Sequence, residues 1–162
     1  MANIFMKLDS LQGESKQQDF DGWIEVEHVN YSVHSPSSVG TGTGSGVGKA
    51  EPSPITVVAY QGAHTPEISK RQYEGMHWKD VTITFLKQTG ATSSKNDKYL
   101  EIKLKEVFLV GFQPQLGGNE KPLETFTFTY NDIEIEYFKQ NDDGSNVSVG
   151  KTGYNTKTNV AR

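Results

Sequence analysis

The sequence predicts a mostly β domain, a small two-sheet β-barrel or sandwich with one short flanking helix at about residues 65–74. Two observations support this prediction. Apolar residues recur at alternate positions through most of the chain, and only one segment carries helix signals. The alternation is clearest in Leu123–Phe138, where one face carries Phe126, Phe128 and Tyr130. Beyond Asn131 the apolar residues have the opposite parity, which indicates a bulge or a bend into a second sheet.

Length and composition favour a single domain over residues 1–162. The 16 basic and 20 acidic residues give a net charge of −4 without a block of one sign, which argues against nucleic acid as the main partner. The chain has no cysteine, which excludes disulfides, thiolate metal sites and a cysteine nucleophile. The N-terminus has no continuous apolar signal segment, and no transmembrane run follows. We therefore expect folding in the cytoplasm, no membrane insertion, and export only by a route without a cleaved signal peptide.

The first part of the chain predicts two strands. Ile4, Met6 and Leu8 alternate as a first strand, which leads into a polar bend. Trp23–His34 predicts a second strand in which neither face is cleanly apolar, so a bulge or two different covering surfaces are expected.

A glycine-rich loop follows at about residues 36–54. It does not match a phosphate-binding loop, because Thr43 and Ala50 stand where that motif requires Gly and Ser or Thr. No frame gives GxGxxG, and a strand rather than a helix follows. Two interpretations remain for this loop. It is either a flexible surface linker or an extended arm that lies along a partner through its backbone.

The single predicted helix has a start signal and a stop signal. Thr65 is the expected N-cap, Pro66 the first helical residue, and Gly75 the residue that ends the helix. Further strands are predicted at Ile55–Tyr60, Trp78–Lys87, Tyr99–Phe112 and Asn146–Asn159. The run Val107–Phe112 is apolar on both faces, so it needs cover from the helix or from another subunit.

No catalytic, cofactor-binding or metal-binding residues are predicted. Glu134 and Glu136 lie two apart on one strand face and could in principle serve acid–base chemistry, but a solvated outer face explains them better. The four histidines form no HxxxH or HxH pair, and no serine stands in a GxSxG motif. A hydrolase that uses the two glutamates is therefore a minor alternative.

Several motifs in order resemble one known family. They are the opening Asn3–Leu8 followed by Gly13-Glu14-Ser15, the strand Ile24-Glu25-Val26, the glycine-rich loop ending at Lys49, Lys105-Glu106-Val107, and the closing Gly153–Asn159. In combination they resemble the type VI secretion tube protein, the haemolysin-coregulated protein (Hcp) family, over essentially the whole chain. The Phe20–Trp23 insert and the Pro-Ser-Pro before Ile55 depart from the pattern and indicate a subgroup.

This resemblance implies a structural, non-enzymatic subunit without a cofactor. Such subunits form hexameric rings that stack into a tube, which is sheathed in the cytoplasm, tipped by a spike protein and propelled out of the cell. The implied partners are other copies of the chain, sheath proteins, the spike protein, and small effector proteins that the lumen carries and protects. The alternative is a monomeric β-barrel that binds a small ligand or a sugar.

Three sets of site residues follow from these interpretations. The expected ring-stacking loop comprises Val39, Gly40, Gly42, Gly44, Gly46, Gly48 and Lys49. Asn30 is the expected lumen residue that contacts cargo. The expected contacts between neighbours in a ring are Val107, Leu109 and Phe112.

Overall fold

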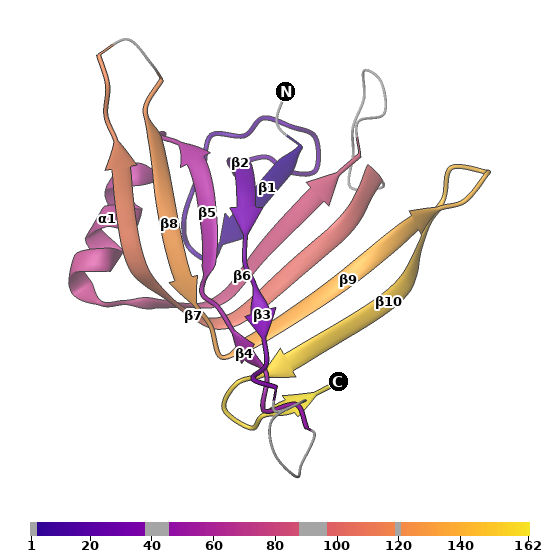
Figure 1. The fold of residues 1–162 in the computed structure, drawn as a ribbon. Coiled ribbons are helices and arrows are strands. Elements are labelled where there is room, and N and C mark those ends of the chain that lie inside the picture. Colours follow the sequence, from indigo (N-terminus) through magenta and orange to yellow (C-terminus); the bar gives the residue numbers. More distant parts are fainter. Residues whose placement is uncertain (1–2, 38–45, 88–96, 119–120) are drawn as a thin grey trace.

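The computed structural model describes residues 3–37, 46–87, 97–118 and 121–162, and it shows a long sheet that closes on itself (Figure 1). The elements in chain order are β1 (Ile4–Leu8), β2 (Ile24–Asn30), β3 (Val33–His34), β4 (Glu51–Pro52), β5 (Ile55–Tyr60), α1 (Thr65–Glu74), β6 (His77–Leu86), β7 (Lys98–Gln115), β8 (Leu123–Thr129), β9 (Asp132–Gln140), β10 (Asn146–Asn155) and β11 (Val160–Ala161). The predicted mostly β class with one flanking helix is confirmed.

Six strands form the closed barrel. The sheet order is β11-β10-β9-β7-β6-β1-β2-β5-β8, and a further pairing of β7 with β8 closes the last six strands of that order into a barrel. The other strands, β9 to β11, extend beyond the barrel on the first half of β7 (Figure 1). We call this extension the wing: residues 98–105 of β7 together with β9, β10 and β11. A second sheet contains only β3 and β4.

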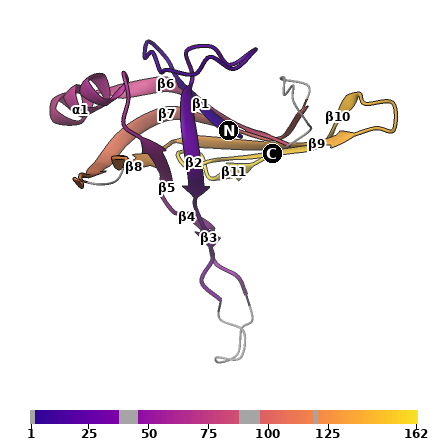
Figure 2. The same cartoon turned by 90° about the horizontal axis from the view of Figure 1, so that it is seen from above.

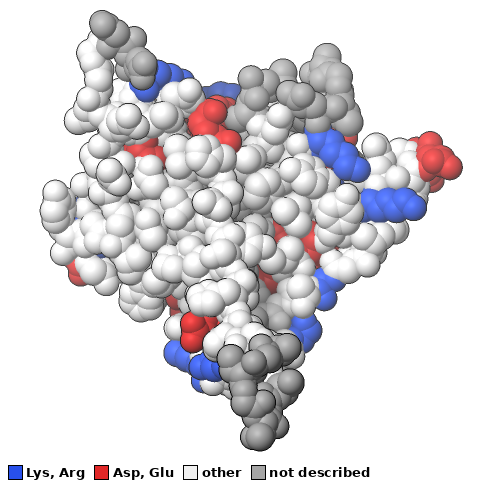
Figure 3. Space-filling model, in the orientation of Figure 1, with Lys and Arg blue, Asp and Glu red and all other residues white. Residues whose placement is uncertain are grey.

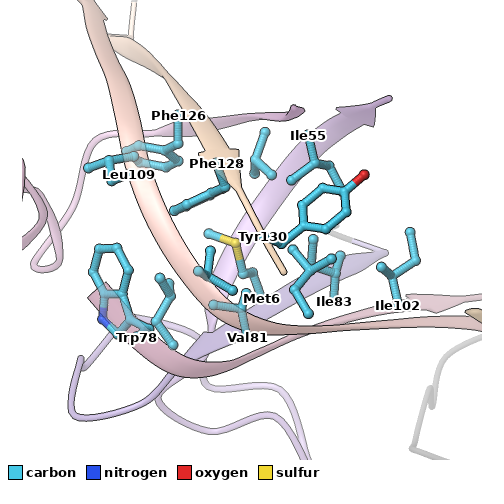
Figure 4. Close-up of a cluster of buried hydrophobic side chains, with 14 of the residues drawn as sticks. Met6, Ile55, Trp78, Val81, Ile83, Ile102, Leu109, Phe126, Phe128 and Tyr130 are labelled. Carbon is cyan, nitrogen blue, oxygen red and sulfur yellow. The ribbon is translucent and has the colours of Figure 1, made fainter. Parts of the chain in front are cut away.

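Large apolar side chains fill the barrel interior (Figure 4). Trp78, Met6, Phe126 and Phe128 are almost completely buried there. In β5 and β8 the buried inward positions alternate with partly buried outward ones, as a barrel with a filled interior requires. A ligand would therefore have to displace core side chains to enter the barrel.

The stretch Leu123–Phe138 forms two strands with a corner between them. β8 ends at Thr129, β9 begins at Asp132, and the chain turns at Tyr130 and Asn131. Of the two alternatives, the bend is therefore the one that occurs, although both strands stay in one sheet because β7 pairs with each of them. β7 bends at the same level, where Glu106 has a φ of 50°. The change of buried face follows from this corner.

The helix spans the predicted residues, but its N-cap differs from the prediction. His64 occupies the cap position, and Thr65 is the first helical residue. The Thr65 hydroxyl accepts a hydrogen bond from the Gly62 amide and donates to the Glu124 carboxylate, so tertiary contacts use the group that capping would need. Gly75 ends the helix in the left-handed conformation, with a φ of 66°, as predicted.

Two predicted strands are shorter in the structure. β2 ends at Asn30, and its pairing with β5 is shifted between Val26 and His28, which confirms the expected bulge. The last predicted strand, Asn146–Asn159, ends at Asn155 as β10; the chain then turns back, and the short strand β11 begins at Val160, beyond the predicted range. Within the described part of the chain, no helix is long and apolar enough to cross a membrane.

Candidate functional site

The glycine-rich segment lies between β3 and β4, which project away from the barrel (Figure 2). We call residues 33–52 the arm and the β3–β4 pair its root. Of the predicted stacking residues, Val39, Gly40, Gly42 and Gly44 lie outside the described residues, whereas Gly46, Gly48 and Lys49 lie within them. At Gly48 an added Cβ would come within 2.7 Å of the Pro36 ring, so this position requires glycine. The described flanks of the arm thus approach each other closely.

A tyrosine fixes the root of the arm to the barrel. The Tyr130 hydroxyl donates a hydrogen bond of 3.0 Å to the Ser53 carbonyl. Burial, followed by the nearby Tyr31, raises the pKa of Tyr130 to about 12, so the phenol keeps its proton at neutral pH. Ser53 in turn pairs with Ser32 through both its amide and its hydroxyl. The arm therefore leaves the barrel at the corner between β8 and β9.

The same corner carries a cluster of charged contacts with the chain's last hairpin. Glu106 accepts hydrogen bonds from Asn131 Nδ2 at 2.6 Å and from Lys157 Nζ at 2.8 Å. The hydrogen bond from Lys157, then that from Asn131, lowers the pKa of Glu106. The Thr156 amide donates to the Asn131 carbonyl at 2.8 Å. The turn between β10 and β11 is thereby attached to the point at which β7 bends.

A second ion pair attaches the end of the hairpin. Arg162 donates to both carboxylate oxygens of Asp132, at 2.8 and 2.6 Å. This hydrogen bonding lowers the pKa of Asp132 and raises that of Arg162. We call these contacts, centred on Glu106–Lys157 and Asp132–Arg162, the corner latch. The latch attaches the turn and the end of the β10–β11 hairpin to the corner at which β7 bends and β9 begins.

The predicted contacts between neighbours lie mostly inside the subunit. Val107 and Leu109 are buried in the barrel core, and Phe112 is partly buried and stacks on Phe126. The side chains of Val107 and Leu109 therefore face the core and not a neighbour, whereas the expected contact at Phe112 stays a prediction. The outward positions on the same strand are Phe108 and Val110. The parity could not be predicted because it is set by the bend at Glu106.

Asn30 lies at an exposed position at the end of β2, opposite Thr56 of β5. Val29 packs against the core, so after the bulge the side chains of His28 and Asn30 point out of the barrel. The face that carries β2, β5 and β8 is largely free of charged side chains at its centre, with Lys, Arg, Asp and Glu nearer its rim (Figure 3).

Glu134 and Glu136 lie on a surface of ion pairs, not in a cleft. Glu134 pairs with Lys151 at 3.2 Å and with Arg162 at 3.5 Å, and Glu136 lies opposite Glu101 in the ladder between β7 and β9. No cluster of three or more potential metal ligands occurs among the described residues. The neighbourhood of the two glutamates is that of a solvated sheet face.

A buried polar cluster at the start of the helix was missed by the sequence reasoning. His64 Nε2 and Glu124 Oε1 lie 2.5 Å apart, and both side chains are almost completely buried. Thr65 also donates to the Glu124 carboxylate at 3.1 Å. The sequence contained a signal for the burial of Glu124, because Glu124 alternates in step with the inward-facing Phe126 and Phe128. The cluster joins β8 to the helix start, and Phe126 packs edge-on against the imidazole.

Comparison with known proteins decides the family. The family described as type VI secretion system effector, Hcp, matches residues 5–137. The chain belongs to the Hcp family. Hcp proteins are the tube proteins of the type VI secretion system; they oligomerise and are secreted through that system. A search of curated proteins finds no significant match.

Solved structures of type VI secretion proteins share the fold at low sequence identity. A structure described as a type six secretion system protein is 23% identical, covers 100% of both chains and has a TM-score of 0.89. Hcp1 from Salmonella typhimurium is 22% identical with 100% coverage of both chains and a TM-score of 0.77. A type VI secretion system effector from Yersinia pestis is 20% identical over 94% of this chain and 98% of its own, with a TM-score of 0.70.

Proposed function

We propose that this Hcp protein is the structural subunit of a type VI secretion inner tube. Six subunits close into a ring, rings stack into a tube, and the tube is propelled out of the cell. The observation that carries the proposal is the Hcp family match over residues 5–137 of a chain that folds as a filled barrel. Because core side chains occupy the interior, the alternative of a monomeric barrel that binds a ligand inside is disfavoured.

Ring stacking is the proposed role of the arm. Val39 to Lys49 would contact the next ring largely through backbone groups, since glycine occupies every second position from 40 to 48. The root supports this role because β3 and β4 project from the barrel and are anchored by Tyr130 (Figure 2). Each arm would contribute weakly, and six arms around a ring would add through multivalency.

The lumen is the proposed place for effectors. Asn30 would contact small effector proteins from the face of β2, β5 and β8, whose centre is largely free of charged side chains (Figure 3). A wall with few charges at its centre holds cargo without the strong, charge-specific attraction that would hinder its release. The sheath and the spike protein are the remaining proposed partners. None of these roles requires a catalytic group, a cofactor or insertion into a membrane.

Imaging and secretion together test this function. Native mass spectrometry of the purified protein is expected to give a six-subunit species, and negative-stain images are expected to show rings. In cells with an active type VI system, the protein is expected in the culture medium, and it is expected to stay inside when the sheath gene is deleted. A monomer at all micromolar concentrations, or export that does not depend on the sheath, would contradict the proposal.

The cargo contact needs a separate test. Asn30→Asp is expected to alter the stability of co-expressed effectors while ring formation stays intact, because the side chain points out of the barrel. Thr82→Asp, on the outward side of β6, is the control. If ring-forming Asn30→Asp protein protects effectors as well as the wild type does, Asn30 is not a cargo contact.

A further inference from the structure

One uncovered apolar surface lies at the bend of β7. It comprises Met76, His77, Phe108 and Val110, which we call the bend patch. Phe108, Val110 and Met76 are 41%, 51% and 46% exposed. The His77 ring stacks on Phe108 with 5.0 Å between ring centroids, and the two residues are partners in the β6–β7 ladder. His77 and Phe108 therefore form a preformed aromatic pair across β6 and β7, and Met76 and Val110 are their exposed neighbours in the chain.

A second apolar surface is concave and lies between the arm root and the wing. It is a hollow of about 230 Å³. On the arm side it is lined by Tyr31, Val33 and Pro52, and on the wing side by Ile133, Ile135 and Tyr154. We call it the wing hollow. No charged side chain is among its lining residues.

We propose that the bend patch of one subunit seats in the wing hollow of the next subunit. This inference rests on the proposed function and names the two surfaces that the ring would join. A closed ring needs two different surfaces on each subunit, since a single self-complementary surface gives only dimers. The bend patch lies on the barrel half of β7 and follows the end of α1 in the chain, whereas the hollow is lined by residues of the arm root and the wing.

Shape and chemistry favour a second copy as the occupant of the hollow. Small-molecule sites place a few polar or charged groups to orient the ligand, and the hollow offers no charged group for this. Protein interfaces instead centre on an aromatic or aliphatic anchor in an apolar pocket. The bend patch supplies that anchor in Phe108, and the oligomerising family supplies the reason for a copy of the same chain.

The contact also explains why the subunit leaves two apolar surfaces exposed to water. A large aromatic and a valine at neighbouring outward positions leave apolar surface in water, which folding alone does not explain. The wing likewise leaves Ile135 and Tyr154 only partly buried beside the exposed Val33. Mutual cover removes both surfaces from water, and this driving force is available only between different subunits.

Crosslinking tests the pairing because the native chain has no cysteine. We use Val110→Cys with Val33→Cys, both at exposed positions, and a flexible bismaleimide. The double variant is expected to give a ladder of covalent species above the dimer, up to a closed ring. Either single variant can give dimers at most. The matched control combines Val110→Cys with Val147→Cys, an exposed residue of the wing outside the hollow, and it is expected to give at least tenfold less ladder.

The outcomes separate the pairing from the proposed function. A ring in native mass spectrometry without a ladder from the double variant would overturn the pairing and leave the ring intact. Efficient dimers from Val110→Cys alone would show that the bend patches of two subunits contact each other, and this would also overturn the pairing. A monomer before crosslinking would contradict the ring itself. As a second measurement, Val110→Asp is expected to raise at least tenfold the protein concentration at which half of the ring dissociates, with an unchanged circular dichroism spectrum. An unchanged concentration contradicts the pairing.

Discussion

The barrel and the wing belong to one sheet but are held together by different means. The barrel has no free edge, because β7 pairs with β8, and its interior is filled by side chains such as Phe126 and Trp78. The wing is an open sheet. Its residues Ile102, Leu104 and Ile133 belong to the same core as the barrel, but its last hairpin is attached at the corner latch by polar contacts. The barrel is therefore stabilised mainly by buried apolar side chains, whereas the last hairpin of the wing depends more on polar contacts.

Two polar side-chain contacts sharpen this comparison. In the barrel, His64 and Glu124 are 4% and 0% exposed; in the latch, Lys157 is 63% and Glu106 50% exposed. Water can replace a lost partner at the latch but not in the barrel. The same chemical change should therefore destabilise the whole fold in one place and only loosen a local segment in the other.

The largest effect is expected from the barrel core. Phe126→Ala removes a completely buried ring that contacts Phe128, Phe112 and His64. We expect it to lower the free energy of unfolding by about 4 kcal/mol, the usual range for such a cavity. Urea unfolding measures the change. Val149→Ala, on the exposed surface of the wing, is the control and should change it by less than about 0.5 kcal/mol. Equal effects would mean that the barrel is not the stable part.

The second effect is expected from the buried pair. Glu124→Ala leaves His64 buried without its carboxylate and deprives Thr65 of an acceptor. We expect a loss of about 3 kcal/mol in urea unfolding, as for other broken buried pairs. Glu134→Ala breaks the contacts with Lys151 and Arg162, both of which are about half exposed, and should cost less than about 1 kcal/mol. A loss at Glu124 no larger than that at Glu134 would show that burial does not decide the outcome.

Much of this comparison could be predicted from the sequence, and the remainder could not. The alternation of apolar residues predicted that Phe126 and Phe128 are buried, and the start and stop signals predicted the helix from Thr65 to Glu74. Both predictions succeed because these features depend only on residues that are close in the chain. The latch depends on contacts of Lys157 with Glu106 and of Arg162 with Asp132, which are separated by 51 and 30 residues in the chain. No local pattern encodes such distant contacts.

The ring contacts show the same limit more sharply. Val107, Leu109 and Phe112 were expected at the interface because the run is apolar on both faces. The structure uses the first two for the core and leaves Phe108 and Val110 outside. The left-handed backbone of Glu106 determines which parity faces inward. A non-glycine residue in that conformation is rarely foreseen from sequence, because tertiary contacts stabilise it.

A smaller and local effect is expected at the latch, and it depends on pH. Because the folded-state pKa values of Glu106 and Asp132 are lowered, their stabilising contribution is present above their ordinary pKa values, near 4, and is lost as the pH falls through the lowered values. We expect hydrogen-exchange protection in residues 153–162 to be constant from pH 7 to 5 and to fall below about pH 4.

Variants test whether the latch is the source of the lost hydrogen-exchange protection. Arg162→Gln should reduce protection in residues 153–162 already at pH 7, while protection in β1 and β6 is unchanged, because the barrel does not use this contact. Lys70→Gln, which breaks an exposed pair within the helix, is the control. Should Arg162→Gln loosen the barrel strands as much as the hairpin, barrel and wing would form one cooperative unit.

The smallest effect on stability, with the largest expected effect on function, concerns the arm. Deleting Thr41–Gly46 shortens the loop between β3 and β4 and should change the free energy of unfolding by only a few tenths to about 1 kcal/mol. The melting temperature of the ring should therefore be almost unchanged. Tube growth and secretion should nevertheless be abolished, because stacking would lose six weak contacts at once.

A control that replaces Thr41–Gly46 with a Gly-Ser sequence of equal length keeps the length of the arm and its glycine content. If backbone contacts carry the stacking, this control should polymerise and be secreted. If the deletion variant is secreted at the normal level, the arm is only a linker, and the rims of the barrels must carry the stacking.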